Sequence, residues 1–169
     1  TPERFFEERA KSKRLEFLSE LTLEELAERR LFLSRDSRTG YLLDRRGDFG
    51  NLFNNGGVSG AGQAAIVEAI QRSALTLDCF DPGLPKLYAN FGFQAVYATR
   101  FDDRFAPRGW PVALGKPDII SMAYAGGPRA TISSRVGTFA PYHHPQVWSS
   151  LDEARARARA VALALDVHF

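Results

Sequence analysis

Four glycines occur within seven positions, from Gly56 to Gly62, and this stretch runs directly into a helical pattern that begins near Gln63. Glycine lets the backbone adopt a positive φ and lets a ligand approach without meeting a Cβ atom. A turn of this kind before a helix directs free N–H groups and the positive end of the helix dipole toward one point. The stretch therefore predicts a phosphate-binding loop, although a flexible turn before a helix would use the same residues.

Two better-known phosphate loops do not fit this stretch. It does not end in Gly-Lys-Ser or Gly-Lys-Thr, so it is not a Walker loop. No acidic residue closes a following strand in the way that a dinucleotide-binding fold requires.

The composition is that of a folded domain. The chain has 169 residues, 44% of them hydrophobic and 25% charged, which is enough for one domain with a core of its own. The net charge is +2, so the overall charge gives little reason to expect a nucleic-acid partner. Cys79 is the only cysteine, which excludes an internal disulfide and a cysteine-based zinc site. There is no bilayer-spanning apolar run and no signal peptide, and we expect a cytoplasmic protein.

Apolar spacing and turn residues predict the order of the elements. The spacing from Phe5 to Leu21 predicts an amphipathic helix, and a capping box at residues 22–25 predicts a second short helix to about Arg30. Helices are also expected after the glycine stretch and at residues 84–90, and an irregular segment at 102–118. Strands are expected at residues 31–34, 41–43, 49–54, 75–80, 94–101 and 119–124, with 75–80 in a central position.

A last helix is expected to begin at a capping box at residues 150–153. Its buried stripe is predicted to consist of Leu151, Ala154, Ala158, Val161 and Leu165. The whole order predicts an α+β (α/β layer) fold, with one mixed and mostly antiparallel central sheet, flanking helices and an extra C-terminal helix.

The segment from Leu84 to Phe93 reads Leu-Pro-Lys-Leu-Tyr-Ala-Asn-Phe-Gly-Phe. Preceded by a strand, a glycine loop, a helix and a strand, it resembles the GNAT superfamily of acyl-CoA-dependent N-acyltransferases, and the likeness covers roughly residues 31–124. In that family the loop after the fourth strand follows Gln/Arg-x-x-Gly-x-Gly/Ala and holds the pyrophosphate of coenzyme A through backbone N–H groups. Gly60 and Gly62 supply the two glycines, whereas Gly57 stands where Gln or Arg is usual.

The resemblance implies a domain organisation and a set of cofactor residues. Residues 1–125 would form the GNAT-like domain, with N-terminal helices at 1–30 and the sheet core at 31–125, and residues 126–169 would pack on it as a loop and helix. Acetyl-CoA (coenzyme A) would be the co-substrate, with no metal. The residues expected to bind it, where the family's fourth and fifth strands splay apart and at the glycine loop, are Asn54, Asn55, Val58, Ser59, Gly60, Ala61, Gly62 and Gln63. The two asparagines also suit an ordinary turn before glycine.

Catalytic residues follow from the same resemblance. Tyr88 matches the family tyrosine that commonly protonates the leaving thiolate, and the alternative is that its ring only packs in the core. The carboxylates that could act on the amine are Asp78, Asp81, Asp102 and Asp103. Asp78 is the most interesting of them, because an unpaired charge on a buried strand is costly. Any one of the four is more often a solvated or capping group.

Other chemically able residues have simpler interpretations. Cys79 reads as a small buried hydrophobic residue, and His143-His144 lacks a third clustered metal ligand. Trp110 is either the wall of a pocket or, as we favour, an anchor for the long loop. The last helix carries a set of basic residues that read as a solvated face, with nucleic-acid contact as the minor alternative: Arg155, Arg157 and Arg159.

The resemblance therefore implies an N-acetyltransferase that transfers an acetyl group from acetyl-CoA to an amine by direct attack, without a covalent enzyme intermediate. The acceptor could be a small amine, a protein amine or an aminoacyl-tRNA, and a homodimer is possible. A function of another class is a non-catalytic GNAT-like binding module within a larger phage-, toxin- or assembly-related protein.

Overall fold

The computed structural model describes residues 1–166, and the end of the predicted C-terminal segment, residues 167–169, lies outside the described residues. Helical elements open the chain and a three-stranded antiparallel sheet follows, in the order β1-β2-β3. These elements are α1 (Pro2–Ala10), η1 (Leu15–Phe17), α2 (Leu23–Ala27), β1 (Arg30–Leu33), β2 (Thr39–Leu43) and β3 (Phe49–Asn54).

The second half of the described chain builds a four-stranded sheet in the order β4-β6-β5-β7. Its strands pair antiparallel except for β5 and β7, which are parallel. Its elements are α3 (Ala61–Gln71), β4 (Thr76–Phe80), α4 (Gly83–Ala89), β5 (Phe93–Thr99), η2 (Asp103–Phe105), η3 (Val112–Leu114), β6 (Ile119–Tyr124), η4 (Arg129–Thr131), α5 (Ile132–Arg135), β7 (Val147–Trp148) and α6 (Leu151–Asp166).

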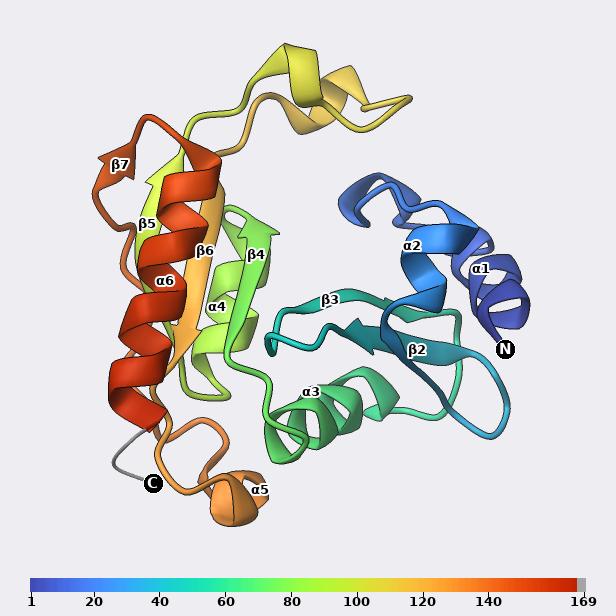
Figure 1. The fold of residues 1–169 in the computed structure, drawn as a ribbon, viewed down its shortest axis with the longest axis horizontal. Helices are drawn as coiled ribbons and strands as arrows, with labels where there is room; N and C mark the ends of the chain where they lie inside the picture. Colours follow the sequence, from blue (N-terminus) through green and yellow to red (C-terminus); the bar gives the residue numbers. More distant parts are fainter. Residues whose placement is uncertain (167–169) are drawn as a thin grey trace.

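The two sheets meet at one end of β3 and β4. An isolated parallel bridge joins Asp48 to Thr76, and the N–H of Leu75 donates to the carbonyl of Gly47 at 2.8 Å. Gly47 has φ +85°, and a Cβ atom there would lie 2.8 Å from the carbonyl oxygen of Ser73, so this approach requires glycine. Beyond the bridge β4 pairs with β6 alone, and the two sheets part between β3 and β4 (Figure 1).

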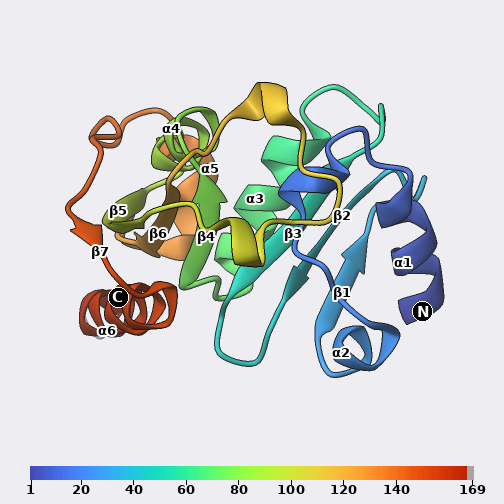
Figure 2. The ribbon, with the colours of Figure 1, turned by 90° about the horizontal axis from the view of Figure 1, so that it is seen from above.

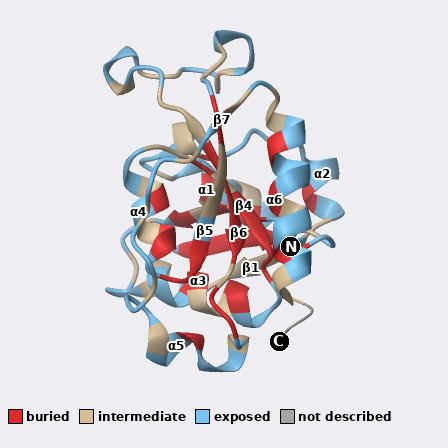
Figure 3. Cartoon of the chain, turned by 90° about the vertical axis from the view of Figure 1, so that its left-hand side faces the viewer, coloured by how far each residue is buried: buried red, intermediate tan, exposed pale blue. Residues whose placement is uncertain are grey.

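Helices cover both faces of this divided sheet. Helices α3 and α4 lie on one face, and α6 lies on the opposite face of the four-stranded sheet, against β4, β5 and β6 (Figure 2). The buried residues concentrate on the strands and on the inner sides of the helices (Figure 3). The largest apolar cluster runs from Tyr41 and Phe49 through α3 and α4 to β6, so one core links the two sheets on the α3–α4 side. The predicted α+β layer fold, with flanking helices and a C-terminal helix, is confirmed.

The N-terminal helix is shorter than predicted. Helix α1 ends at Ala10, and of the apolar residues that follow it Phe17 belongs to a separate turn of 3-10 helix at Leu15–Phe17, while Leu18 and Leu21 lie after that turn. The hydroxyl of Ser12 accepts a hydrogen bond from the N–H of Arg14 at 3.2 Å. Such a local bond offers the backbone an alternative to the helix, and apolar spacing alone does not detect it.

The second helix begins as predicted but ends early. The hydroxyl of Thr22 and the carboxylate of Glu25 form both halves of the expected capping box. Helix α2 ends at Ala27 rather than near Arg30, because Arg30 already pairs with Leu43 in the first sheet.

Two further expectations about position are corrected. Strand β4 was expected in the middle of a single sheet, but it is the outer strand of the four-stranded sheet, beside the parting. In α6 the expected stripe holds at Ala154 and Ala158, whereas Val161 is exposed and Ala162 is fully buried in its place. The buried residues of α6 are alanines that recur every fourth position, Ala154, Ala158 and Ala162, and this spacing places Ala162 rather than Val161 against the sheet.

Candidate functional site

A cavity of about 740 Å³ lies between β3 and β4, where the two sheets part. Its walls come from four parts of the chain: the segment after α1, strand β3, the start of α3, and the pair β4–α4. The parting of two strands thus produces a space large enough for a cofactor, at the place where one sheet gives way to the other.

The glycine loop forms one end of this cavity, which Gly60, Gly62 and Gln63 line. Gly60 caps α3 with φ +81°, a conformation that favours glycine. The N–H of Ala61 donates to the carbonyl of Val58, and that of Ala64 to the carbonyl of Gly60. The N–H groups of Gly62 and Gln63 have no partner among the described residues, so they are available to an anion.

The other loop residues predicted to bind cofactor lie around this end without all reaching it. Asn54 lines the cavity, and its side-chain oxygen accepts from the N–H of Gly57 at 3.2 Å, which holds the loop in shape. Asn55 turns away, because its amide donates to the carbonyl of Glu8 at 2.7 Å. A shallower hollow of the surface lies outside the main cavity and contains Val58, Ser59 and Ala61.

A β-bulge in β3 forms part of the wall of the cavity. Gly40 pairs with Phe53 and Leu42 with Gly50, so Asn51 and Leu52 together lie opposite Tyr41. The extra residue of a bulge leaves a backbone group unpaired, as an incoming carbonyl oxygen requires. Asn51 carries the unusual φ of +49°, and its side-chain oxygen accepts from Arg9 Nε at 2.6 Å. Our sequence reasoning missed this residue, for which the tolerance of asparagine for positive φ was the only signal.

Two basic residues after α1 also line the cavity. Lys13 and Arg14 are exposed at its edge, and the Arg14 guanidinium lies 5.8 Å from the centre of the Phe17 ring. The basic run at residues 11–14 was the available signal. These side chains favour an anionic occupant.

Tyr88 lines the inner part of the cavity from α4. Its side chain is 8% exposed, and its ring packs edge-on against Phe49 and Phe93. Burial, followed by the nearby Cys79, raises the pKa of the phenol well above its usual value. Tyr88 is therefore protonated at neutral pH. The sequence left open whether Tyr88 packs in the core or lies in the site, and in the structure its ring does both.

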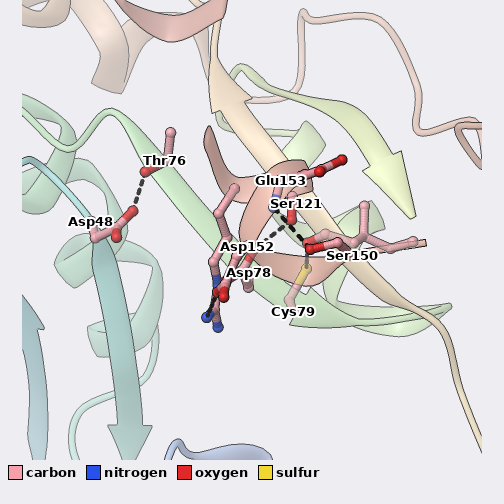
Figure 4. Close-up of polar contacts among 10 residues, drawn as sticks. Asp48, Thr76, Asp78, Cys79, Ser121, Ser150, Asp152 and Glu153 are labelled. Atoms are coloured by element: carbon pink, nitrogen blue, oxygen red, sulfur yellow. Dashed lines mark hydrogen bonds and ion pairs between the residues drawn. The ribbon is translucent and has the colours of Figure 1, made fainter. Parts of the chain in front are cut away.

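Asp78 lines the same cavity from β4. Ser121, its pairing partner on β6, donates from Oγ to Asp78 Oδ1 at 2.7 Å (Figure 4). The other carboxylate oxygen of Asp78 accepts from Arg155 Nε of α6. Asp78 is thus hydrogen-bonded and ion-paired, so its charge on the strand does not carry the free-energy cost of an unpaired buried carboxylate. Arg155 is therefore not only a solvent-exposed residue of the helix face, as the sequence suggested. Desolvation lowers the pKa of Arg155, but the charge and hydrogen bond of Asp78, together with the charges of Asp48 and Asp152, outweigh it and the net shift is upward.

Asp48 forms the bridge between the sheets with Thr76, and its carboxylate accepts a hydrogen bond from the hydroxyl of Thr76 (Figure 4). Desolvation raises the pKa of its carboxyl, against the Thr76 hydrogen bond, and repulsion from Asp44 and Asp78 adds to the rise.

The other three candidate carboxylates lie elsewhere. Asp81 accepts a hydrogen bond from the hydroxyl of Tyr142 at 2.5 Å. Asp102 pairs with Arg104, whose hydrogen bonds hold the pKa of Asp102 at about 2. Asp103 pairs with Lys116 on the exposed loop. Each thus has a structural partner, and none of them lines the main cavity.

The remaining chemically able residues have structural partners too. Cys79 is buried, and burial raises the pKa of its thiol, which disfavours a nucleophilic thiolate. His144 Nε2 lies 2.9 Å from Asp118 Oδ2, and within residues 1–166 no three potential ligands gather into a metal site. Trp110 packs on Phe80 and Phe101, so it anchors the long loop.

Comparison with known proteins gives no assignment. No protein-family model matches the chain, and neither the curated proteins nor the solved structures contain a significant match. None of the helices in the described part of the chain is both long enough and apolar enough to cross a membrane.

Proposed function

We propose that this protein is an acyl-CoA-dependent N-acetyltransferase whose cofactor occupies the cavity between β3 and β4. The observation that carries the proposal is the composition of that single cavity. It holds free N–H groups at a helix start, a bulged strand, a protonated phenol and a carboxylate. Acyl transfer from a thioester to an amine needs a site for the carbonyl oxygen, an acid for the thiolate and an acceptor for the amine proton.

Each part of acetyl-CoA has a suitable neighbour in this arrangement. The pyrophosphate suits the N–H groups of Gly62 and Gln63, and Lys13 and Arg14 add positive charge at the edge of the same cavity. The pantetheine arm suits the free edge of β3, whose bulge at Asn51–Leu52 offers a backbone group to the thioester carbonyl. Tyr88 then protonates the leaving thiolate. The resemblance of the chain to the GNAT superfamily assigns the same roles to the loop and to Tyr88.

A pair of matched glycine variants tests the proposal. Gly60 and Gly56 both have a positive φ, and a Cβ atom at either position would meet no atom within 4 Å. Only Gly60 lines the cavity. Gly60→Val and Gly56→Val therefore carry a similar backbone strain, but only the first puts a branched side chain at the phosphate position.

Calorimetric titration with coenzyme A should show a loss of affinity of tenfold or more for Gly60→Val and little change for Gly56→Val. Equal affinities for the two variants would contradict the proposed cofactor position. Binding of coenzyme A without acylation of any amine would favour a non-catalytic binding module instead.

A further inference from the structure

Two smaller cavities adjoin the main one on the side of α6. One, of about 250 Å³, lies under the loop at residues 105–107, and the other, of about 270 Å³, lies beside Gly50. Both are lined by the Asp78–Arg155 ion pair, and Asp78 also lines the main cavity. Asp78 therefore stands where all three spaces meet. A second substrate in either small cavity would reach the acyl group there without passing the cofactor.

The cavity under residues 105–107, here called the side cavity, has mostly apolar walls. They include Phe80, Phe105, Ile119 and Leu151. Its charged lining consists of Glu20, Asp78 and Arg155, and Glu20 already accepts a hydrogen bond from the N–H of Arg108 at 3.0 Å. The ion pair thus presents one negative and one positive group side by side, within an apolar space sized for a small molecule.

Resting on the proposed function, we infer that the side cavity binds the acceptor and that the acceptor is an α-amino acid with an apolar side chain. Its ammonium group suits Asp78, and its carboxylate suits the guanidinium of Arg155. Arg155 uses Nε for Asp78, and its Nη1 lies 3.9 Å from the highly exposed Asp152, so the outer N–H groups of the fork remain largely available. The apolar side chain then packs on Phe80 and Ile119.

Other amine classes fit this cavity less well. A polyamine or a lysine side chain brings no carboxylate for Arg155 and places further positive charge beside it. A folded protein or a tRNA would exceed a space of about 250 Å³, apart from a single terminal residue.

The reaction balances with groups already present. The ammonium group of the amino acid passes one proton to Asp78, and the free nitrogen lone pair attacks the thioester carbonyl. A C–N bond forms, the C–S bond breaks, and the sulfur leaves with its electron pair and takes a proton from Tyr88. The second proton of the nitrogen restores Tyr88, and Asp78 releases its proton to solvent. The net products are the N-acetyl amino acid, coenzyme A and one proton.

The test uses three matched ligands and two variants of α6. The ligands are leucine, 3-methylbutylamine, which lacks the carboxylate, and 4-methylpentanoate, which lacks the ammonium group. Arg155→Met removes the carboxylate partner, whereas Arg157→Met is the control, because Arg157 lies over the Trp148 ring at 4.5 Å. Thermal melting of each variant confirms that it is folded, and Arg155→Lys, which keeps the charge, should restore part of the affinity.

In calorimetry we expect Arg155→Met to lower the affinity for leucine about ten- to a hundredfold, because a charge-assisted pair is lost. The affinity for 3-methylbutylamine should fall by less than threefold. Arg157→Met should leave the affinities for all three ligands unchanged. Three results would overturn the inference. One is an equal loss of affinity for leucine and 3-methylbutylamine, and another is no binding of leucine. The third is acylation of polyamines at a rate that does not depend on Arg155.

The coenzyme A titration separates the two proposals. Coenzyme A binding without leucine binding defeats only the acceptor assignment. Leucine binding that depends on Arg155, in a chain that does not bind coenzyme A, retains the side cavity as an amino-acid site and defeats the acyltransferase.

Discussion

At the scale of single residues, the proposed acyl transfer depends most on Tyr88. Tyr88→Phe keeps the ring and its packing on Phe49 and Phe93 but removes the only proton that the side chain can deliver. General acid catalysis contributes roughly a hundred- to ten-thousandfold, so kcat should fall by that order. The affinity for acetyl-CoA should change little, since the hydroxyl acts mainly as the thiolate develops. Steady-state thiol release and calorimetry measure the two quantities, and parental turnover would leave Tyr88 as a core residue only.

The same tyrosine makes a prediction about pH. Burial raises the pKa of Tyr88 and of Tyr41 in the folded protein, while the unfolded chain ionises near the ordinary value of about 10. Above about pH 10 the unfolded state therefore binds fewer protons than the folded state, and the free energy of unfolding falls as pH rises. Urea unfolding across the alkaline range should show this fall, and Tyr88→Phe should make it shallower. A decline as steep in Tyr88→Phe as in the parent would argue against a buried phenol.

Residue types showed which side chains could do chemistry but not which of them meet. Tyr88, Asp78 and the glycines were expected in the site, and the structure brings Tyr88, Asp78, Gly60 and Gly62 to one cavity. Arg155 was read as part of a solvated face because its partner Asp78 lies 77 positions away in the sequence. Lys13 and Arg14, which line the cavity, follow the end of α1 in a segment that was expected to be helical.

At the scale of elements, local patterns predicted most strands and helices, since alternation, capping boxes and turn residues are local signals. The capping box at Thr22 and the whole of β3 are examples. The bulge at Asn51 and the parting of β3 from β4 could not be read in this way. The bulge depends on the pairing of β3 with β2. The parting depends on how the two sheets meet, where Gly47 lies close to Ser73. No short window of sequence contains either contact.

Helix α6 should be sensitive to the size of its inner residues. Ala158 is 1% exposed where the helix lies on the four-stranded sheet, whereas Ala160 of the same helix is exposed. Ala158→Leu should lower the free energy of unfolding by about 1–3 kcal/mol, because extra methyl groups in a filled space force side chains or backbone to move. Ala160→Leu should be close to neutral. Denaturant unfolding compares them, and equal midpoints would mean that α6 does not pack as described.

At the scale of the whole molecule, two small sheets joined by the Asp48–Thr76 bridge have a cavity between them. One apolar core on the α3–α4 side keeps the sheets together, while α6 covers the other face, and its Arg159 donates to the carbonyl of Arg46 in the first sheet's hairpin. A cofactor in the opening would contact both sheets, so its binding should also stabilise the fold.

Backbone hydrogen exchange with and without coenzyme A shows whether the cofactor occupies the cavity between β3 and β4, because it reports on the N–H groups of the glycine loop and of the bulge. We expect slower exchange on binding at Gly62 and Gln63 of the loop and at the Asn51–Leu52 bulge. Helix α5, which lies outside the cavity, should exchange as before. No change in exchange at saturating coenzyme A, or protection that leaves out the loop and the bulge, would contradict this position of the cofactor.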